Sequence, residues 1–364
     1  MCGGGCARSR KKKNDGIVAI DFFCGAGGVT RGLSDAGISV IAGIDIEEHF
    51  RKTYECNNPD SLFIKSDIAR VTGRRISNLL DGFDYRSLMF AGCAPCQPFS
   101  SHFKDKKQPD DRESALEHFG RIIRVVKPDF VFSENVPGML KKDNGRVLSE
   151  FNSLLKRLGY HVTSETVNVK WYGIPQDRRR LIILASRIGV SMPLPERTHG
   201  PGLQPYATVR DAIKKYHKLK AGSECRHFHN HNCSSLSPLN LKRMLATPRD
   251  GGSWSDWPTN LRLKCHSKDG SGHSDVYGRM RWDYPAPTLT CRCYSISNGR
   301  FGHPSQNRAL SFREAAALQT FPDDYVFHGI SNKVLGMQIG NAVPVLLAKL
   351  IGKEVTRVAH ESRR

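Results

Sequence analysis

The sequence lacks any run of about 18 apolar residues that could span a bilayer, and its first segment, MCGGGCARSRKKK, lacks the apolar core of a signal peptide. A disulfide framework is also missing, because the eleven cysteines are odd in number and follow no regular spacing. We therefore expect reduced thiols and an intracellular protein that does not enter membranes. It would lie in the cytoplasm or nucleoid of a bacterium, or in the nucleus of a eukaryote.

Acidic residues are scarce relative to basic ones. The 364 residues include 55 lysines and arginines against 35 acidic residues, which gives a formal net charge of +20. The basic residues are spread along the chain instead of being confined to a tail. This excess favours a polyanionic partner, with nucleic acid ahead of an anionic membrane surface. A basic surface that only keeps the protein soluble is the alternative.

Composition and hydrophobic pattern divide the chain into four predicted segments. Residues 1–15 are rich in Gly, Arg and Lys and read as a basic flexible arm. Residues 16–190 alternate short apolar runs with amphipathic stretches, which is typical of an α/β domain with a mostly parallel sheet. Residues 191–305 are rich in Pro, Gly, Ser and His, and predict a smaller loop-rich domain. Residues 306–364 become helical again and are expected to return to the first domain.

Local signals support two helices in that last segment. The stretch SFREAAALQTF begins with Ser311, which is followed three residues later by Glu314. This is the pattern of a capping box at the start of a helix. Pro344 begins an apolar spacing that also predicts a helix. No internal repeats are visible.

The stretch DFFCGAGG stands where an apolar strand gives way to a helix, which is where open α/β sheets bind ligands. Gly25, Gly27 and Gly28 would permit a tight turn and close backbone approach. Thr30 occupies the place of the third glycine of a dinucleotide fingerprint, so the stretch is weak evidence alone. The alternative is a glycine turn that only packs.

Two later acids strengthen the ligand interpretation. Asp45 ends the next strand, where a carboxylate could accept both hydroxyls of a ribose, and Asp67 follows the strand after that, where it could accept from an adenine amine. Acids at strand ends can also be helix caps. With the glycine loop, they predict an adenosine-bearing cofactor.

The stretch FAGCAPCQPFSSHF holds Cys93 and Cys96 three residues apart. A zinc clip is disfavoured because no second Cys-x-x-Cys pair lies nearby. A redox dithiol remains open, since Pro95 sits inside the pair as in some redox motifs. The strand before the pair and the polar run after it are typical of a loop over a site, where a single cysteine could act as a nucleophile.

The order of five motifs carries a resemblance to a known family. DFFCGAGG, PCQPFS, ENV, QDRRR and QIGNAVP follow one another over most of the chain. In this the sequence resembles the DNA cytosine-5 methyltransferases. The resemblance implies a Rossmann-like domain that uses S-adenosylmethionine and a target-recognition domain over residues 191–305. It also implies a duplex DNA substrate from which one cytosine is flipped out.

The resemblance also implies the catalytic residues. Cys96 would be the nucleophile that adds to C6 of cytosine, and the other cysteine of the pair would not. Glu134 of ENV would act at N3, with Asn135 beside it, and Arg178 and Arg180 of QDRRR would hold Glu134 and the O2 of the base. The alternatives are a capping or ion-paired acid and arginines that contact DNA phosphate, as expected for the arginine between these two.

The glycine loop, the strand ends and the resemblance together predict the residues that contact the cofactor. They are Asp21, Phe23, Gly25, Gly27, Gly28, Asp45, Ile46, Asp67, Ile68, Pro95 and Asn341. Asn341 could equally position the Pro-Cys loop or the recognition domain, and a simple helix start is its alternative. Two positions depart from the family. Cys93-Ala94 stands where Gly-Pro or Pro-Pro is frequent, and Ile46 where an aromatic ring can stack on adenine.

Candidate DNA contacts lie in two places. Gln97 and Ser100 belong to a loop that could close behind the flipped base, and Thr288 belongs to PAPTLT, which resembles the Thr-Leu signature of the recognition domain. Several arginines there could reach guanine edges, although phosphate or solvent contacts are more usual: Arg262, Arg279, Arg281 and Arg292. The stretch ECRHFHNHNC alternates Cys and His, which is not the usual zinc spacing, so no metal is expected.

Two other functions stay open. A related enzyme could methylate cytosine in tRNA, and a chain with the same fold could bind DNA without turnover. The motifs QDRRR and ENV, with the net charge, disfavour a nicotinamide-dependent oxidoreductase. A single flipped base requires only a monomer, and a cognate restriction endonuclease cannot be read from one chain.

Overall fold

The computed structural model describes residues 12–13, 16–94, 113–140, 145–266 and 275–362. The strands are β1 Lys12–Lys13, β2 Ile17–Phe22, β3 Ser39–Asp45, β4 Leu62–Lys65, β5 Phe83–Asp84, β6 Ser87–Gly92, β7 Phe130–Asn135, β8 His161–Asn168, β9 Gln176–Asp177, β10 Arg179–Ser186 and β11 Ala286–Pro287. The α-helices are α1 Gly28–Asp35, α2 Arg51–Asn57, α3 Gly73–Leu80, α4 Glu113–Val126, α5 Arg146–Arg157, α6 Val209–Ile213, α7 Pro238–Ala246, α8 Phe312–Leu318, α9 Asn332–Gly340 and α10 Val345–Glu361.

A seven-stranded sheet forms the lower body, in the order β4-β3-β2-β6-β7-β10-β8. The five strands from β4 to β7 run parallel, and β10 is antiparallel to both of its neighbours. The α/β class with a mostly parallel sheet is therefore confirmed. Strand β8 was not predicted, because HVTSETVN carries too few apolar residues to look like a strand of this sheet.

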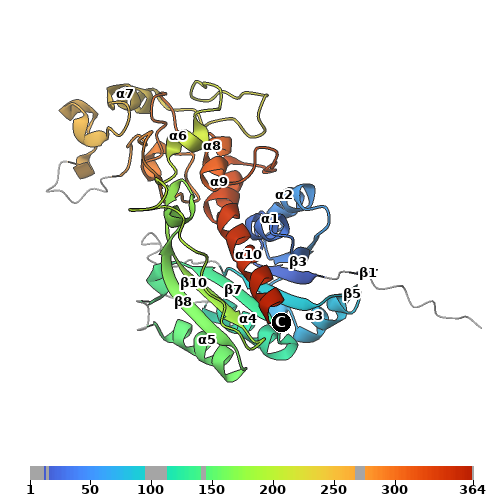
Figure 1. Ribbon diagram of the computed structural model, residues 1–364. Coiled ribbons are helices and arrows are strands. Elements are labelled where there is room, and N and C mark those ends of the chain that lie inside the picture. The colour runs from blue at the N-terminus through green and yellow to red at the C-terminus, as the bar shows by residue number, and fades with distance from the viewer. Residues whose placement is uncertain (1–11, 14–15, 95–112, 141–144, 267–274, 363–364) are drawn as a thin grey trace, which may run out of the picture.

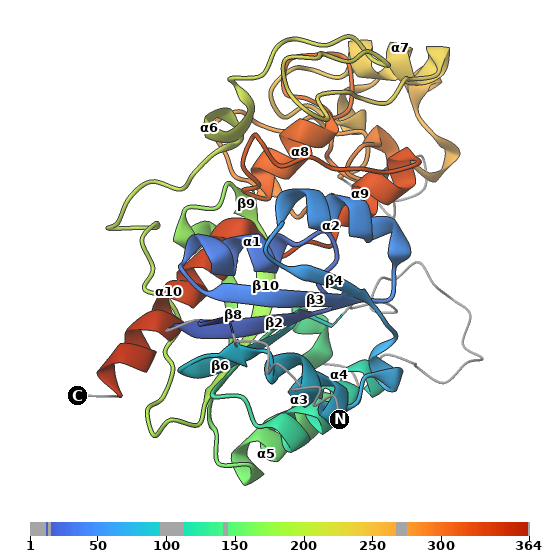
Figure 2. The same ribbon diagram turned by 90° about the vertical axis from the view of Figure 1, so that its right-hand side faces the viewer.

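Helices cover both faces of the sheet because the side chains of a strand alternate between faces. In β2, Ile17 and Ala19 pack in the cluster that includes α1 and α10. Val18, Ile20 and Phe22 pack in the cluster of α3, α4 and α5 on the opposite face. Figure 2 shows α1 and α10 above the sheet and α3, α4 and α5 below it.

The apolar spacing after Pro344 forms helix α10, which packs on the same face of the sheet as α1. Helix α10 lies against α1, and a Cβ added at Gly32 would stand 2.4 Å from the carbonyl oxygen of Val345 and 2.6 Å from Cβ of Ala348. Glycine at this position therefore lets the two helix backbones approach. By length and hydropathy Asn332–Glu361 could cross a membrane, but 61% of its apolar window is buried here, as in a core helix.

An upper body contains α6 to α9 and many loops (Figure 1). Its larger cluster joins Val209, Ile213 and Met280 to Phe312 of α8 and Ile339 of α9. A smaller cluster surrounds the buried Trp257. Helices α8 and α9 therefore share a core with residues from 209 to 301, and α10 is the helix of the last segment that packs on the sheet.

Candidate active site

The carboxyl ends of the parallel strands bring the predicted site residues to one edge of the sheet. Phe22 at the end of β2 is paired with Ile44 of β3 on one side and with Gly92 of β6 on the other. Glu134 lies near the end of β7, beside β6. Parallel strands thus place the glycine loop, the loop after β6 and the ENV motif next to one another.

The loop after β2 has an unusual backbone. Phe23 has φ of 61° and Gly25 has φ of 52°, and a positive φ is a strained conformation for a bulky residue such as phenylalanine. A Cβ placed on Gly25 would meet no atom of the described residues within 4 Å, so among them the loop borders open space. This combination suits the close approach of a ligand.

Asp45 is tied to this loop. Its Oδ2 accepts from the Gly25 N–H at 2.8 Å and its Oδ1 from the Glu47 N–H at 2.9 Å. Burial raises the pKa of Asp45, while these backbone bonds oppose the rise. Because each carboxylate oxygen can accept more than one hydrogen bond, both remain capable of accepting ribose hydroxyls.

Gly27 and Gly28 pack against protein, so their side-chain directions are closed. A Cβ at Gly27 would lie 2.7 Å from Nδ2 of Asn58 and 2.8 Å from the hydroxyl of Tyr325, and one at Gly28 would lie 2.8 Å from the carbonyl oxygen of Val343. Close packing thus accounts for the absence of a side chain at these two glycines, and their contact with the cofactor stays a prediction. Tyr325 also donates to the carbonyl of Ala26, a contact that the sequence did not suggest.

Asp21 is fully buried beneath the loop. Its Oδ2 accepts from the Thr30 hydroxyl at 2.8 Å, and that hydroxyl lies 3.0 Å from the Tyr54 hydroxyl. Burial raises the pKa of Asp21 to about 7. Asp21 thus supports the loop from below, and its contact with the cofactor stays a prediction.

Asp67 stands at the start of a short 3-10 helix, η2, over Ile68–Arg70, with Oδ1 accepting from the Ala69 N–H at 2.9 Å. One oxygen therefore caps the turn, as the alternative interpretation held. Arg121 of α4 donates through Nη2 to the carbonyls of Ile68, Ala69 and Val71 at 3.3, 3.0 and 2.9 Å. This arginine fixes the segment behind Asp67, and no motif marked it. Ile46, the position of the missing aromatic ring, is 57% exposed.

Glu134 and Arg180 form a buried ion pair. Glu134 is 6% exposed, and its Oε1 lies 2.7 Å from Nε of Arg180 on the neighbouring strand β10. Oε1 has no well-directed hydrogen-bond donor among the described residues, so charge attraction holds the pair more than alignment does. Arg180 also donates through Nη1 to the Arg179 carbonyl at 2.7 Å, which fixes the guanidinium.

Arg178 points elsewhere. Its Nη1 donates to the carbonyl of Leu289 at 3.0 Å, and the guanidinium also reaches the carbonyls of Gly340 and Ala342 at 3.4 Å. Among the described residues, Arg180 forms the ion pair with Glu134, and a role for Arg178 at the O2 of the base stays a prediction. Asn135 is buried, and its Oδ1 accepts from the Val136 N–H at 3.0 Å, which shapes the turn after Glu134.

The loop after β6 begins at this site. Ser133 donates to the carbonyl of Gly92 at 2.7 Å, which ties the ends of β6 and β7 together. Cys93 and Ala94 are the last residues described before a gap. Four predicted residues, Pro95, Cys96, Gln97 and Ser100, lie outside the described residues.

The PAPTLT motif docks on QDRRR. Strand β11 pairs with β9, so that Ala286 faces Gln176 and Pro287 faces Asp177. The Thr288 hydroxyl donates to the carbonyl of Asp177 at 2.9 Å, which joins the two motifs, and a DNA contact of Thr288 stays a prediction. Asn341 likewise contacts a residue that follows PAPTLT, because its Oδ1 lies 2.8 Å from Sγ of Cys291. This contact suits the positioning role considered for Asn341, and its cofactor contact stays a prediction.

The four candidate arginines separate by burial. Arg279 is buried and donates to the carbonyls of Met244, Thr247, His303 and Gln306 and to Oδ1 of Asn307, so it is structural. Arg262 is exposed, but its guanidinium donates to two main-chain carbonyls. Arg281 and Arg292 are exposed, with Arg281 over the ring of Tyr284 and Arg292 3.4 Å from Asn298 Oδ1. Arg262, Arg281 and Arg292 therefore keep the accessibility that a DNA contact requires, and Arg279 does not.

Comparisons with known proteins agree with this arrangement. A family model described as C-5 cytosine-specific DNA methylase matches residues 17–357. The chain is 42% identical over 354 residues to the type II methylase M.HgiDII of Herpetosiphon aurantiacus, covering 95% of this chain and 98% of that protein. It is 34% identical over 345 residues to the type II methyltransferase M1.HphI of Haemophilus parahaemolyticus, covering 94% and 87%.

Solved structures share the fold. A prophage-encoded E. coli protein described as a DNA modification methyltransferase gives a TM-score of 0.69 at 21% identity, covering 94% of this chain and 99% of that one. A variant of Spodoptera frugiperda DNMT2 gives 0.62 at 16% identity, covering 94% and 99%. At such identities the likeness concerns the fold.

Proposed function

The chain belongs to the C-5 cytosine-specific DNA methylase family and is a DNA cytosine-5 methyltransferase, and we propose that Cys96 is its nucleophile and Glu134 the acid at the base. The observation that carries this assignment is the buried Glu134–Arg180 pair at the carboxyl end of β7. It lies beside the end of β6, which leads into the segment containing Cys96.

The chemistry requires a nucleophile because C5 of cytosine is unreactive toward an electrophile. The Cys96 thiolate adds to C6 while Glu134 delivers or shares a proton at N3, so the ring becomes an enamine with a nucleophilic C5. After methylation, the proton on C5 leaves to a base, the C5–C6 double bond re-forms, and the C6–S bond breaks to release Cys96. Arg180 orients Glu134 and can donate to O2 of the base.

S-adenosylmethionine is the methyl donor of this family and supplies an electrophilic methyl group when it is bound. The chain fits such a cofactor: among the described residues Gly25 borders open space, and Asp45 presents a carboxylate beside it. Asp67 follows the next strand outward from Asp45 in the sheet order. In our proposal Asp45 holds the ribose, Asp67 the adenine amine, and Phe23 and Ile68 pack against the cofactor.

A covalent trap tests the nucleophile. In 5-fluorocytosine a fluorine atom replaces the hydrogen on C5, so no C5 proton can leave after methylation. The C6–S bond should therefore persist, and the enzyme should remain covalently attached to the DNA. With the cofactor present, the native protein and Cys93→Ser should both give a denaturant-resistant protein–DNA adduct, whereas Cys96→Ser should give none. An adduct that persists in Cys96→Ser and disappears in Cys93→Ser would assign the nucleophile to the other cysteine.

Residues 191–305 are proposed as the target-recognition domain, with Arg281 and Arg292 as candidate readers of duplex DNA. The docking of PAPTLT on QDRRR supports this arrangement, because it joins the recognition segment to the catalytic strand. The protein would act inside the cell, as a monomer, on a short site that a cognate type II restriction endonuclease would otherwise cut. Protection of a modified plasmid against a panel of such endonucleases tests the pairing.

A further inference from the structure

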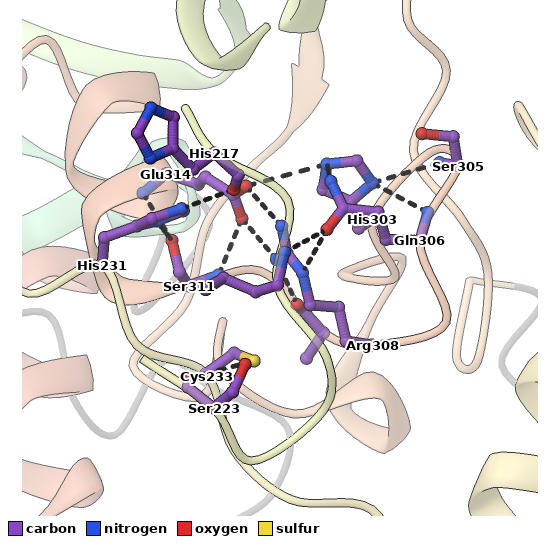
Figure 3. A network of polar contacts seen from close by, with 12 residues as sticks. His217, Ser223, His231, Cys233, His303, Ser305, Gln306, Arg308, Ser311 and Glu314 are labelled. Atoms are coloured by element: carbon purple, nitrogen blue, oxygen red, sulfur yellow. Dashed lines mark hydrogen bonds and ion pairs between the residues drawn. The ribbon is translucent and has the colours of Figure 1, made fainter. Parts of the chain in front are cut away.

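The stretch ECRHFHNHNC forms a loop of the upper body, and its alternating cysteines and histidines differ in burial. The segment forms turns around a single antiparallel bridge between Glu224 and Asn232, so its residues do not share one strand face. His231 and Cys233 are buried, and Figure 3 shows His231 directed at Ser311. The Cys233 thiol donates to the carbonyl of Lys220 at 3.2 Å. Cys225 and His227 stay near the surface.

There they meet a histidine that the sequence pattern did not include. Sγ of Cys225 lies 3.4 Å from Nδ1 of His217 and 3.6 Å from Nδ1 of His227. The possible ligand atoms of all three residues lie within 4.8 Å of one another. His217 is eight residues before Cys225, at the end of a separate segment after α6, so only the fold brings it here.

These separations match a tetrahedral metal site. With Zn–S near 2.3 Å and Zn–N near 2.05 Å, the S-to-N edge of a tetrahedron is about 3.6 Å and the N-to-N edge about 3.4 Å. The two S-to-N distances already fall there, and the two rings are exposed, so a modest rotation can close the third edge. Two imidazoles and a thiolate suit Zn²⁺ better than Mg²⁺ or Ca²⁺, which prefer oxygen ligands.

The surrounding structure holds two of the three residues in place before any ion binds. The buried His231 lies with Nε2 2.8 Å from the carbonyl of His217, and its own carbonyl accepts from the Cys225 N–H at 2.9 Å. His231 Nδ1 lies 2.9 Å from the Ser311 hydroxyl at the start of α8. One interior residue thus positions the backbones of His217 and Cys225, which is the support that metal sites require.

We propose that His217, Cys225 and His227 bind one Zn²⁺, with water in the fourth position. Binding replaces the thiol proton of Cys225, which leaves to solvent, so the thiolate, two neutral imidazoles and the ion together carry a charge of about +1. The ion closes the loop of residues 217–233 and anchors it, through His231 and Ser311, to the helix that starts at Phe312. It lies apart from Glu134 and stabilises the recognition domain instead of taking part in methyl transfer.

Metal titration of the full chain tests the site. Protein freed of metal by a chelator and then dialysed should bind one equivalent of Zn²⁺ or Co²⁺, and Co²⁺ should show a thiolate-to-metal charge-transfer band. Cys225→Ser should remove that band and weaken binding by more than about 100-fold, since losing a ligand costs more than the 10–100-fold typical of residues outside the ligand shell. His217→Ala and His227→Ala should weaken binding as well.

Matched controls come from the same region. Cys265→Ser removes an exposed cysteine elsewhere in the upper body, and His229→Ala removes an exposed histidine of the same loop, so both should bind like the native protein. One equivalent bound equally well by Cys225→Ser, or no binding by the native protein, would overturn the proposal. Because the readout is metal binding, the result does not depend on which residue performs the methyl transfer.

Discussion

At the scale of single residues, Asp21 is a buried carboxyl group whose charge opposes folding. Its pKa rises from 3.8 to about 7 because burial disfavours the ionised form. Between about pH 4 and 7 the folded protein therefore holds a proton at Asp21 that the unfolded chain has lost. The free energy of unfolding should fall as the pH rises through this interval, at up to about 1.4 kcal/mol per pH unit from this group.

Asp21→Asn removes this titration and keeps an oxygen that can accept from Thr30. Urea unfolding should show a flatter pH dependence for the variant, with its largest relative gain in stability above pH 7. Asp60→Asn, at an exposed carboxylate, serves as the control and should keep the native slope. If Asp21→Asn also kept the native slope, Asp21 would be ionised in the folded protein.

At the scale of elements, the start of α8 contains a buried ion pair, of which the sequence analysis predicted only the capping role of Glu314. The capping box of Ser311 and Glu314 is confirmed. The structure adds Arg308, whose Nη1 and Nη2 each lie 2.7 Å from an oxygen of Glu314, with both side chains almost fully buried (Figure 3). Desolvation opposes ionisation, but Arg308 and the Ser311 N–H outweigh it and lower the pKa of Glu314 to about 2.

This pair should show strong coupling. Arg308→Met and Glu314→Gln should each cost about 3–5 kcal/mol because each leaves a buried partner uncompensated, and the double variant should cost less than their sum. Since the folded pKa of Glu314 is depressed, its stabilisation is present above about pH 4.5 and is lost as the pH falls toward 2. Urea unfolding of the four proteins measures both effects, and additive costs would show that the two residues act independently.

The elements also show why sequence interpretation stops where it does. The strands with continuous apolar runs, β2, β3, β6, β7 and β10, were predictable because burial on both faces demands such runs. The reversed direction of β10 was not, because strand direction depends on connections that leave no local pattern. The role of Arg121 and the partners of Arg178 were not predicted. Both side chains bind main-chain carbonyls, which no side-chain motif records.

At the scale of the whole molecule, three distant segments meet around β9. Gln176 donates to Oε1 of Gln319 at 2.9 Å and accepts from the Leu289 N–H at 3.0 Å. Gln319 in turn donates to the carbonyls of Ile339 and Ala342, and Arg178 also reaches Ala342. Strand β9, the PAPTLT segment and the QIGNAVP turn are thus joined by hydrogen bonds. Each motif could be recognised separately, but their junction depends on the contacts of Gln176 with Leu289 and Gln319, which are more than 100 residues away in the sequence.

This junction predicts different outcomes for two neighbouring arginines. Lysine keeps the charge but lacks the planar fork, so Arg178→Lys should loosen the hold on Leu289 and on the turn before α10. The upper body should then unfold before the sheet in a second, earlier transition, and affinity for DNA should fall about 10-fold or more, the effect of about 1.4 kcal/mol of lost positioning.

Arg180→Lys disturbs the pair with Glu134 instead, so unfolding should stay a single transition while the rate of adduct formation with 5-fluorocytosine DNA falls. Calorimetry and DNA binding, run on both variants, separate the two roles. If Arg178→Lys slowed adduct formation and left DNA affinity unchanged, the arginine would act at the base. The apolar cluster that α6, α8 and α9 share would then be what holds the upper body in place.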